Sequence, residues 1–254
     1  MNKSLFLSSI LLLLLGLSAC GGTKMLKDPE ALVVPQALAA ASDQNLSATL
    51  DWVIFRDGPG TWARNVDWDE YLIRVYNSGD DSIQLTNIIV IDSLGTSAEV
   101  GISRKKLVKA SKKTKKRYKG QGLEVKAGVR AGTLLAAGAI TIAAAGSVAG
   151  AAIYGSSALA AGALTGILLA PALAVGGIVR GVNNSKVNKQ IESRQTLLPI
   201  TLQQEEERNL DIFFPLSPSP RQVQLTYTDS QGEHTLIIDT HVALEGLHLV
   251  KTAE

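Results

Sequence analysis

The chain has 254 residues, of which 46% are hydrophobic and 19% are charged, and its formal net charge is +2. This length fits one domain with appendages or two small domains. The near-neutral balance by itself indicates no class of partner, and the single cysteine, Cys20, excludes an intramolecular disulfide.

The first residues have the pattern of a signal peptide. Lys3 precedes a leucine-rich run from Leu5 to Leu17, which is too short for a membrane span of about 20 residues. The run ends in Leu-Ser-Ala-Cys at 17–20, which resembles the lipobox of bacterial lipoproteins, in which the cysteine is acylated and becomes the new N-terminus. The resemblance predicts a signal peptide over 1–19 and a lipid anchor on Cys20.

The lipobox also implies a location. Three acyl chains anchor a protein stably in a membrane, whereas a single acyl chain anchors it only marginally. Gly21 stands where an aspartate would resemble the inner-membrane retention signal of enteric bacteria. The resemblance therefore implies the bacterial outer membrane, with the protein facing the periplasm. Residues 20–46, which contain two prolines, are predicted to be a lipid-anchored tether.

The segment 47–103 has the period of two that is typical of half-buried strands. Strands are predicted over 50–54, 71–76 and 83–91, with a short one within 98–102, and turn signals separate them. β-Branched residues and closely spaced turns favour an antiparallel β-sandwich. The pattern resembles the early strands of bacterial immunoglobulin-like modules.

Two tryptophans, Trp62 and Trp68, stand in a predicted loop with several charged residues. Exposed indoles would stack on a glycan or peptide, and the neighbouring carboxylates would accept hydrogen bonds. Tryptophan is more often well buried with one polar handle, so the favoured interpretation is that the loop caps the end of the sandwich.

The segment 104–126 is predicted to be a basic linker that is extended or loosely helical, because like charges repel. Ten of the sixteen residues from 104 to 119 are Lys or Arg. An anionic surface is the favoured partner, either lipid headgroups or cell-wall groups, and a solvated linker is the alternative. Nucleic acid is not expected, because aromatics are sparse and the protein is exported. The candidate contacts are Arg104, Lys105, Lys106, Lys109, Lys112, Lys113, Lys115, Lys116, Arg117 and Lys119.

The run from Ala131 to Val179 contains forty-nine residues and no charged side chain. It divides into 131–153 and 158–179, and either part is long enough to cross about 30 Å of hydrocarbon as a helix. GxxxG spacing lets membrane helices approach closely. A glycine-zipper helical hairpin that associates with the membrane or oligomerises is therefore predicted over 127–182, and a soluble buried hairpin is the alternative. Its candidate helix-packing residues are Gly128, Gly132, Gly146, Gly150, Gly162, Gly166, Gly177 and Gly181.

The lipobox, the Gly/Ala-rich paired spans and the accompanying β domain together resemble the glycine-zipper outer-membrane lipoproteins of the SlyB and surface-antigen type. The resemblance covers the signal and the hairpin. It differs in order, because those proteins have β structure after the hairpin, whereas here the hairpin interrupts the β domain.

After the run, 183–254 is predicted to be the second half of the sandwich. Strands are expected near 197–202, 210–215, 223–227 and 235–239, and the last two form a hairpin around the turn 229–232. The fold class is therefore mainly β, an immunoglobulin-like antiparallel sandwich interrupted by an Ala/Gly-rich helical hairpin.

The sequence predicts neither catalysis nor a cofactor. His234, His241 and His248 lack the spacing of a metal site, and no phosphate loop or nucleophile motif occurs. The predicted function is a structural or interaction role in the cell envelope, with membrane lipid and a second copy of the chain as expected partners. The alternatives are a periplasmic module that binds glycan or peptide through the Trp62/Trp68 loop, and an accessory subunit of an envelope or secretion complex.

Overall fold

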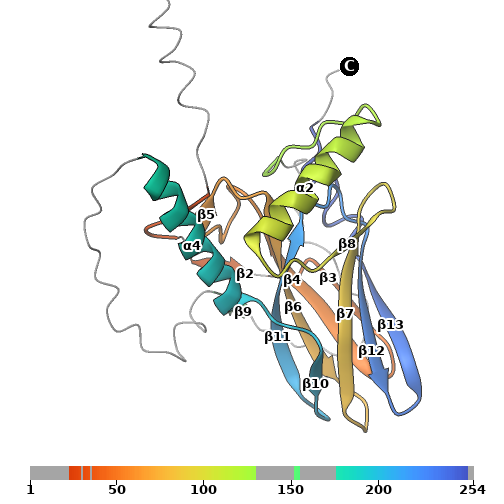
Figure 1. The fold of residues 1–254 in the computed structure, drawn as a ribbon. Helices are drawn as coiled ribbons and strands as arrows, with labels where there is room; N and C mark the ends of the chain where they lie inside the picture. Colours follow the sequence, from red (N-terminus) through yellow and green to blue (C-terminus); the bar gives the residue numbers. More distant parts are fainter. Residues whose placement is uncertain (1–22, 30, 35, 130–151, 155–175, 251–254) are drawn as a thin grey trace, which may run out of the picture.

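The computed structural model describes residues 23–29, 31–34, 36–129, 152–154 and 176–250. The described chain is mainly β, with several antiparallel sheets and two helices. Figure 1 shows two larger sheets side by side, with both helices gathered at one end and flank of the molecule.

The first large sheet has the strand order β11-β6-β4-β3, and all of its pairs are antiparallel. Alternating apolar residues produce these strands, and β11 pairs with β6 along its whole length from Glu207 to Pro215. The strands are β3 (Ala39–Ser42), β4 (Leu46–Ile54), β6 (Trp68–Asn77) and β11 (Glu207–Pro215).

The second large sheet has the order β10-β7-β12-β13, with β8 also paired to β7. The predicted hairpin around 229–232 is confirmed, because Asp229 pairs with Gly232 at the turn that joins β12 to β13. The strands are β7 (Ile83–Ile91), β8 (Ser97–Glu99), β10 (Ile200–Leu202), β12 (Gln222–Asp229) and β13 (Gly232–Asp239).

One apolar core lies between the two large sheets. Leu50 and Ile73 of the first sheet and Leu85 and Leu225 of the second are all fully buried in it. The sheets also join the two halves of the sequence, because β11 pairs with β6 and β12 with β7. The chain on either side of the apolar run therefore contributes to the same core.

The segment predicted as a tether is instead part of the body. Two short strands, β1 (Lys24–Met25) and β2 (Leu32–Val34), precede β3. β1 pairs with β5 (Ala63–Arg64), and β3 pairs with β4. The tether prediction was wrong because Leu32, Val34 and Leu38 are buried in the main core, and this burial holds the backbone in place.

The basic segment is also ordered. Arg104–Lys119 forms α2, a helix of 16 residues, instead of an extended linker. Ser103 caps its N-terminus by accepting a hydrogen bond from Lys106 N, and Gly120 stands at its C-cap. A stripe of buried residues on one face outweighs the repulsion between the lysines, and it consists of Leu107, Ser111, Thr114 and Tyr118.

The described parts of the predicted hairpin differ from the prediction. Ala152–Tyr154 forms β9, which pairs with β2, where a helix was expected. The helix α4 spans Gly176–Arg194 and so continues past the expected end at 182. It continues because Val187 and Ile191, one turn apart, pack into a second apolar cluster. The rest of the predicted hairpin, 130–151 and 155–175, lies outside the described residues.

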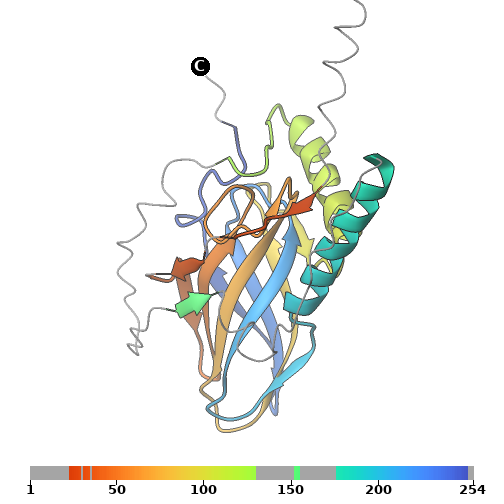
Figure 2. The same cartoon turned by 90° about the vertical axis from the view of Figure 1, so that its left-hand side faces the viewer.

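This second cluster lies between the helices and the first sheet. Figure 2 shows α2 and α4 on the same side of the sheet that contains β11 and β6. The cluster brings together residues of α2, α4 and β11, the first residue of β6, and the segment just before β6. Its members are Leu107, Val187, Ile191, Phe213, Trp68, Trp62, Ala63 and Val66. The helices are thus attached to the body by their own core.

Candidate functional site

The underside of α2 is fixed to the body by specific contacts. Ser111 Oγ accepts a hydrogen bond from Leu216 N at 3.0 Å and lies within hydrogen-bond distance of the carbonyl oxygens of Asp67 and Leu107. The Tyr118 ring is fully buried, and its hydroxyl lies 2.9 Å from Ser93 Oγ. Burial raises the pKa of Tyr118. The helix therefore has one defined orientation on the body.

Three of the ten basic residues point toward the body. Arg104 Nε donates to Thr23 Oγ1 at 3.2 Å, and Lys115 Nζ lies 2.9 Å from Asp67 Oδ1. The Arg117 guanidinium pairs with the buried Asp92 carboxylate. These three side chains are only partly exposed, and their contacts hold α2 in place.

The other seven basic residues form one exposed face. All are lysines, and they recur at spacings that bring them to the side opposite the buried stripe. Among the described residues, none of these seven ammonium groups has a carboxylate within 4.0 Å. We call this set the lysine face, and it consists of Lys105, Lys106, Lys109, Lys112, Lys113, Lys116 and Lys119. The sequence predicted ten equivalent contacts, and the structure divides them into seven exposed and three structural.

The lysine face begins close to the proposed acylation site. Thr23 is only 4% exposed, and its hydroxyl accepts the hydrogen bond from Arg104 in the first turn of α2. Only three peptide steps separate Thr23 from Cys20, and such a segment spans at most about 11 Å. The ordered body therefore begins almost directly after the cysteine.

The tryptophan loop does not present its rings to solvent. Trp62 is 7% exposed and Trp68 is 2% exposed, and both pack in the second cluster beneath the helices. Trp62 Nε1 donates to Glu70 Oε2 at 2.7 Å, which gives the indole its polar partner. This burial agrees with the expectation that the indoles are buried, and it places them beneath α2 and α4.

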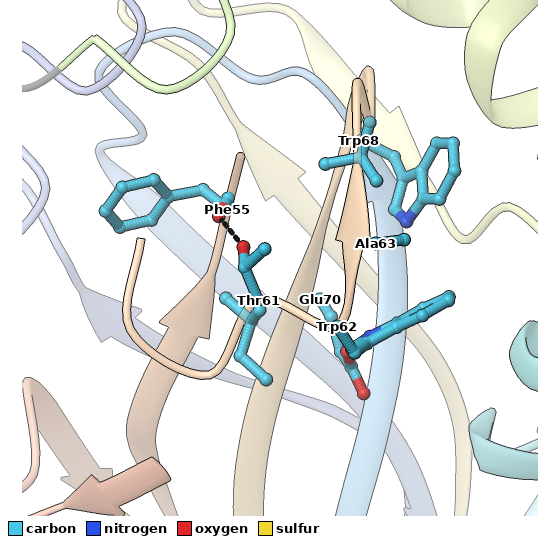
Figure 3. A pocket seen from close by; sticks show the side chains of 8 residues that line it. Phe55, Thr61, Trp62, Ala63, Trp68 and Glu70 are labelled. Carbon is cyan, nitrogen blue, oxygen red and sulfur yellow. Dashed lines mark hydrogen bonds between the residues drawn. The ribbon is translucent and has the colours of Figure 1, made fainter. Parts of the chain in front are cut away.

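A small cavity lies beside this loop, and Figure 3 shows its lining. Phe55 and Thr61 line one side, and the Thr61 hydroxyl donates to the Phe55 carbonyl. The other lining residues include Trp62, Trp68 and Glu70. The cavity holds about 10 Å³, which is room for no more than a single water molecule. It does not accommodate a glycan or a peptide side chain.

Buried charges tie α4 to the first sheet. Arg194, at the end of α4, donates through Nε to Glu70 Oε1 at 2.7 Å, and its guanidinium lies 5.9 Å from the Trp62 ring centre. Asp211 on β11 lies close enough to Glu70 and Arg194 for the charges of both to affect its pKa. Burial, followed by the negative charge of Glu70, raises the pKa of Asp211 to about 7, although Arg194 opposes this shift.

A second buried polar pair joins the C-terminal segment to β6. His248 Nε2 lies 2.8 Å from Asp69 Oδ2, and both side chains are fully buried. Gly128 N donates to His248 Nδ1 at 3.2 Å, so the neutral ring with its proton on Nε2 satisfies both contacts. Sequence reasoning missed this pair because nothing in the sequence indicates that residues 179 positions apart meet.

The structure describes only three of the eight predicted helix-packing glycines, Gly128, Gly177 and Gly181. Gly128 stands in a turn with φ of +82° rather than in a helix, and a Cβ there would lie 2.5 Å from the Arg56 carbonyl oxygen. The helical expectation for Gly128 is therefore wrong. Gly177 and Gly181 lie within α4. The remaining candidates, Gly132, Gly146, Gly150, Gly162 and Gly166, lie outside the described residues.

Within the described part of the chain, no group of three His, Cys, Asp or Glu side chains is arranged to hold a metal ion. Of the helices that the structure describes, none combines the length and the apolarity needed to span a bilayer. Comparison with protein-family models, with curated proteins and with solved structures found no match for this chain.

Proposed function

We propose that this protein is a lipid-anchored component of the bacterial cell envelope with a structural or interaction role. In this proposal Cys20 is acylated, the chain is held at the outer membrane, and it faces the periplasm. The observation that carries the proposal is the sequence Leu-Ser-Ala-Cys directly after an apolar leader, followed within three residues by the ordered body at Thr23.

The proposal also assigns a role to the uncharged run Ala131–Val179. Its Ala/Gly-rich composition and GxxxG spacings favour a helical hairpin that inserts into the membrane or associates with a second copy of the chain. In this description the hairpin is an insertion in an immunoglobulin-like sandwich. Supporting this, strands from before and after the run pair with each other and share one core.

A labelling experiment tests the anchor. The full-length chain is expressed in a bacterium with a clickable palmitate analogue, beside Cys20→Ser and a control, Gly22→Ala, which leaves the four lipobox residues intact. We expect label on the wild type and the control and none on Cys20→Ser, which has no cysteine left. A wild-type chain that is exported but carries no label contradicts the proposal.

A second experiment distinguishes attachment through the acyl chains on Cys20 from attachment through the run Ala131–Val179. Membranes from cells that express Cys20→Ser are washed with carbonate and then with urea. Retention of this form is expected if the run Ala131–Val179 inserts into the bilayer. Complete release shows that the hairpin is not inserted, while leaving the acyl anchor of the wild type intact.

No observation favours the alternative in which the Trp62/Trp68 loop captures a glycan or peptide, because both indoles are buried against the helices. Stacking on either ring would require α2 and α4 to leave the body. The third candidate, an accessory subunit of an envelope or secretion complex, stays a prediction, and loss of the protein in cells without its partner would support it.

A further inference from the structure

We propose that the lysine face of α2 docks on the anionic headgroups of the same bilayer that holds the acyl chains. This inference rests on the proposed acylation of Cys20. It adds a second point of attachment and an orientation: the body lies against the membrane, with the lysine face of α2 turned toward the lipid. Three independent observations lead to it.

The first observation is the charge of the face itself. It carries seven lysines between residues 105 and 119, and no described carboxylate pairs with any of them. A helix with this spacing presents a charged strip about 21 Å long, from the rise of 1.5 Å per residue. Juxtamembrane lysines are attracted to an anionic leaflet when they lie within about a Debye length of it.

The second observation is the distribution of lysine and arginine. Both arginines of α2, Arg104 and Arg117, make contacts with the body, whereas every residue of the exposed face is a lysine. Arginine forms bidentate pairs with individual phosphates, whereas lysine acts as a hydrated point charge. A face made only of lysines suits a laterally mobile layer of headgroups better than one fixed phosphate group.

The third observation is the distance to the anchor. Thr23 is buried and bonded to Arg104 at the start of α2, and Cys20 lies at most about 11 Å from it along the chain. An acylated Cys20 would therefore hold the first turn of α2 near the bilayer surface. A long tether would let the body leave the surface, but Lys24–Met25 already pairs with β5 and Ala39–Ser42 with β4.

Nucleic acid is a poorer match for this surface. Binding of single strands relies on aromatic side chains between the basic ones. Tyr118, the one aromatic residue of α2, is fully buried and contributes to the core. The lysine face therefore supplies positive charge but no exposed aromatic ring on which a base could stack.

The experiment measures lysine reactivity on the membrane. Acylated full-length protein is reconstituted into vesicles of phosphatidylcholine alone or mixed with phosphatidylglycerol, and an uncharged acylating reagent is followed by mass spectrometry. Each lysine near such a surface is worth a factor of about five in affinity. We therefore expect Lys109, Lys112 and Lys116 to react at least about fivefold more slowly in the anionic vesicles, and salt should remove the difference.

An internal reference fixes the orientation. Gln231 is exposed in the turn between β12 and β13, at the end of the sheet opposite the contact between Arg117 and Asp92. Figure 1 shows this turn at the far end of the body from α2. A lysine introduced by Gln231→Lys should react equally fast in both kinds of vesicle.

Two matched triple variants test the role of charge. The substitutions Lys109→Gln, Lys112→Gln and Lys116→Gln should abolish the protection of the remaining Lys105 and Lys119, because about a hundredfold of surface affinity is lost. The same three positions changed to Arg keep the charge and should keep the protection. Thermal unfolding of both variants should match the wild type, since these side chains are exposed.

Three outcomes overturn the inference. Equal reactivity in both kinds of vesicle, with the protein still floating with them, shows that the protein is attached to the membrane but that the lysine face does not dock. Clustering of the anionic vesicles shows that the face binds a second membrane instead. Protection by added polyanionic cell-wall polymer but not by phosphatidylglycerol assigns the face to the wall. Failure of the protein to float with phosphatidylcholine vesicles is distinct, because it contradicts the acyl anchor itself.

Discussion

At the scale of single residues, Asp69 and His248 illustrate how a buried charge is kept stable. Both side chains are fully buried, and His248 is the partner of Asp69 Oδ2 at 2.8 Å. Asp69 Oδ1 has no hydrogen-bond partner among the described residues. Burial, together with the charge of Asp69, raises the pKa of the nearby Tyr71 well above its ordinary value of 10.0. The hydrogen bond from the His248 ring is therefore the main interaction that offsets the cost of burying the Asp69 carboxylate.

This arrangement predicts a large effect of His248→Ala. Removing the ring leaves the Asp69 carboxylate buried without a partner, and such a loss costs about 3 to 5 kcal/mol of unfolding free energy. Urea unfolding monitored by fluorescence measures it. Asp69→Asn in the His248→Ala background should restore part of the loss, because the unpaired charge is gone. A His248→Ala protein within about 1 kcal/mol of the wild type would contradict this account.

At the scale of elements, the end of α4 is attached through charges rather than through apolar contacts alone. Arg194 bonds to Glu70, and Asp211 stands near both. The pKa of Asp211 is raised from its ordinary value of 3.8 to about 7 in the folded protein, chiefly because burial disfavours the charged form of the carboxyl group. The folded state thus binds this proton more tightly than the unfolded state does.

The sign of the pH dependence follows from linkage. Between pH 3.8 and about 7 the folded state holds more protons at Asp211 than the unfolded state, so this group makes stability fall as pH rises through that window. A tenfold change in proton affinity corresponds to about 1.4 kcal/mol, which limits the effect to roughly 4 kcal/mol. Asp211→Asn should therefore remove the decline and stabilise the protein at pH 8.

Unfolding free energies measured from pH 4 to 8 test this prediction. Asp80→Asn is the control, because Asp80 is exposed and makes no hydrogen bond that the structure records. This control should keep the wild-type slope. If Asp211→Asn shows the same slope as the wild type, Asp211 is not the group responsible.

At the scale of the whole molecule, the two halves of the sequence form one core. β11 pairs with β6 from Glu207 to Pro215, and β12 pairs with β7 from Gln222 to Thr228. Each half alone would leave β11 without its partner and would leave β6, β7 and β12 with one unpaired edge each, so that the apolar faces of both sheets would be exposed. The body is therefore expected to fold only when both halves are present.

Expression of the chain as two fragments, 1–154 and 155–254, tests this expectation. Together the fragments should co-purify and unfold in one transition, because the strand pairs join them without a covalent link. Each fragment expressed alone should be insoluble or degraded. A fragment 155–254 that is folded by itself would show that the second half is an independent domain.

The strands with clear alternation were predictable from the sequence. Leu225, Tyr227, Leu236 and Ile238 alternate with polar residues around a turn, and this local pattern specifies the hairpin of β12 and β13. The predicted leader and the candidate acyl site at Cys20 also follow from local composition, and both stay predictions. In each case the information lies within a short window of sequence.

The helix α2 was not predictable in the same way. Its buried stripe contains the polar residues Ser111 and Thr114, so hydrophobic periodicity is weak, and its ten basic residues favour an extended chain. The helix exists because Ser111 bonds to the body and Leu107 and Tyr118 are buried in it. The same contacts decided which lysines face solvent.

The sequence alone therefore determined the uncharged run and most of the strands, and it predicted the leader and the candidate acyl site, because each of these depends on neighbouring residues. Only the tertiary structure decided that Thr23 is fixed beside α2, that Trp62 and Trp68 are buried, and that Asp69 meets His248. These contacts join residues far apart in sequence, and they form through burial and pairing that no local pattern encodes.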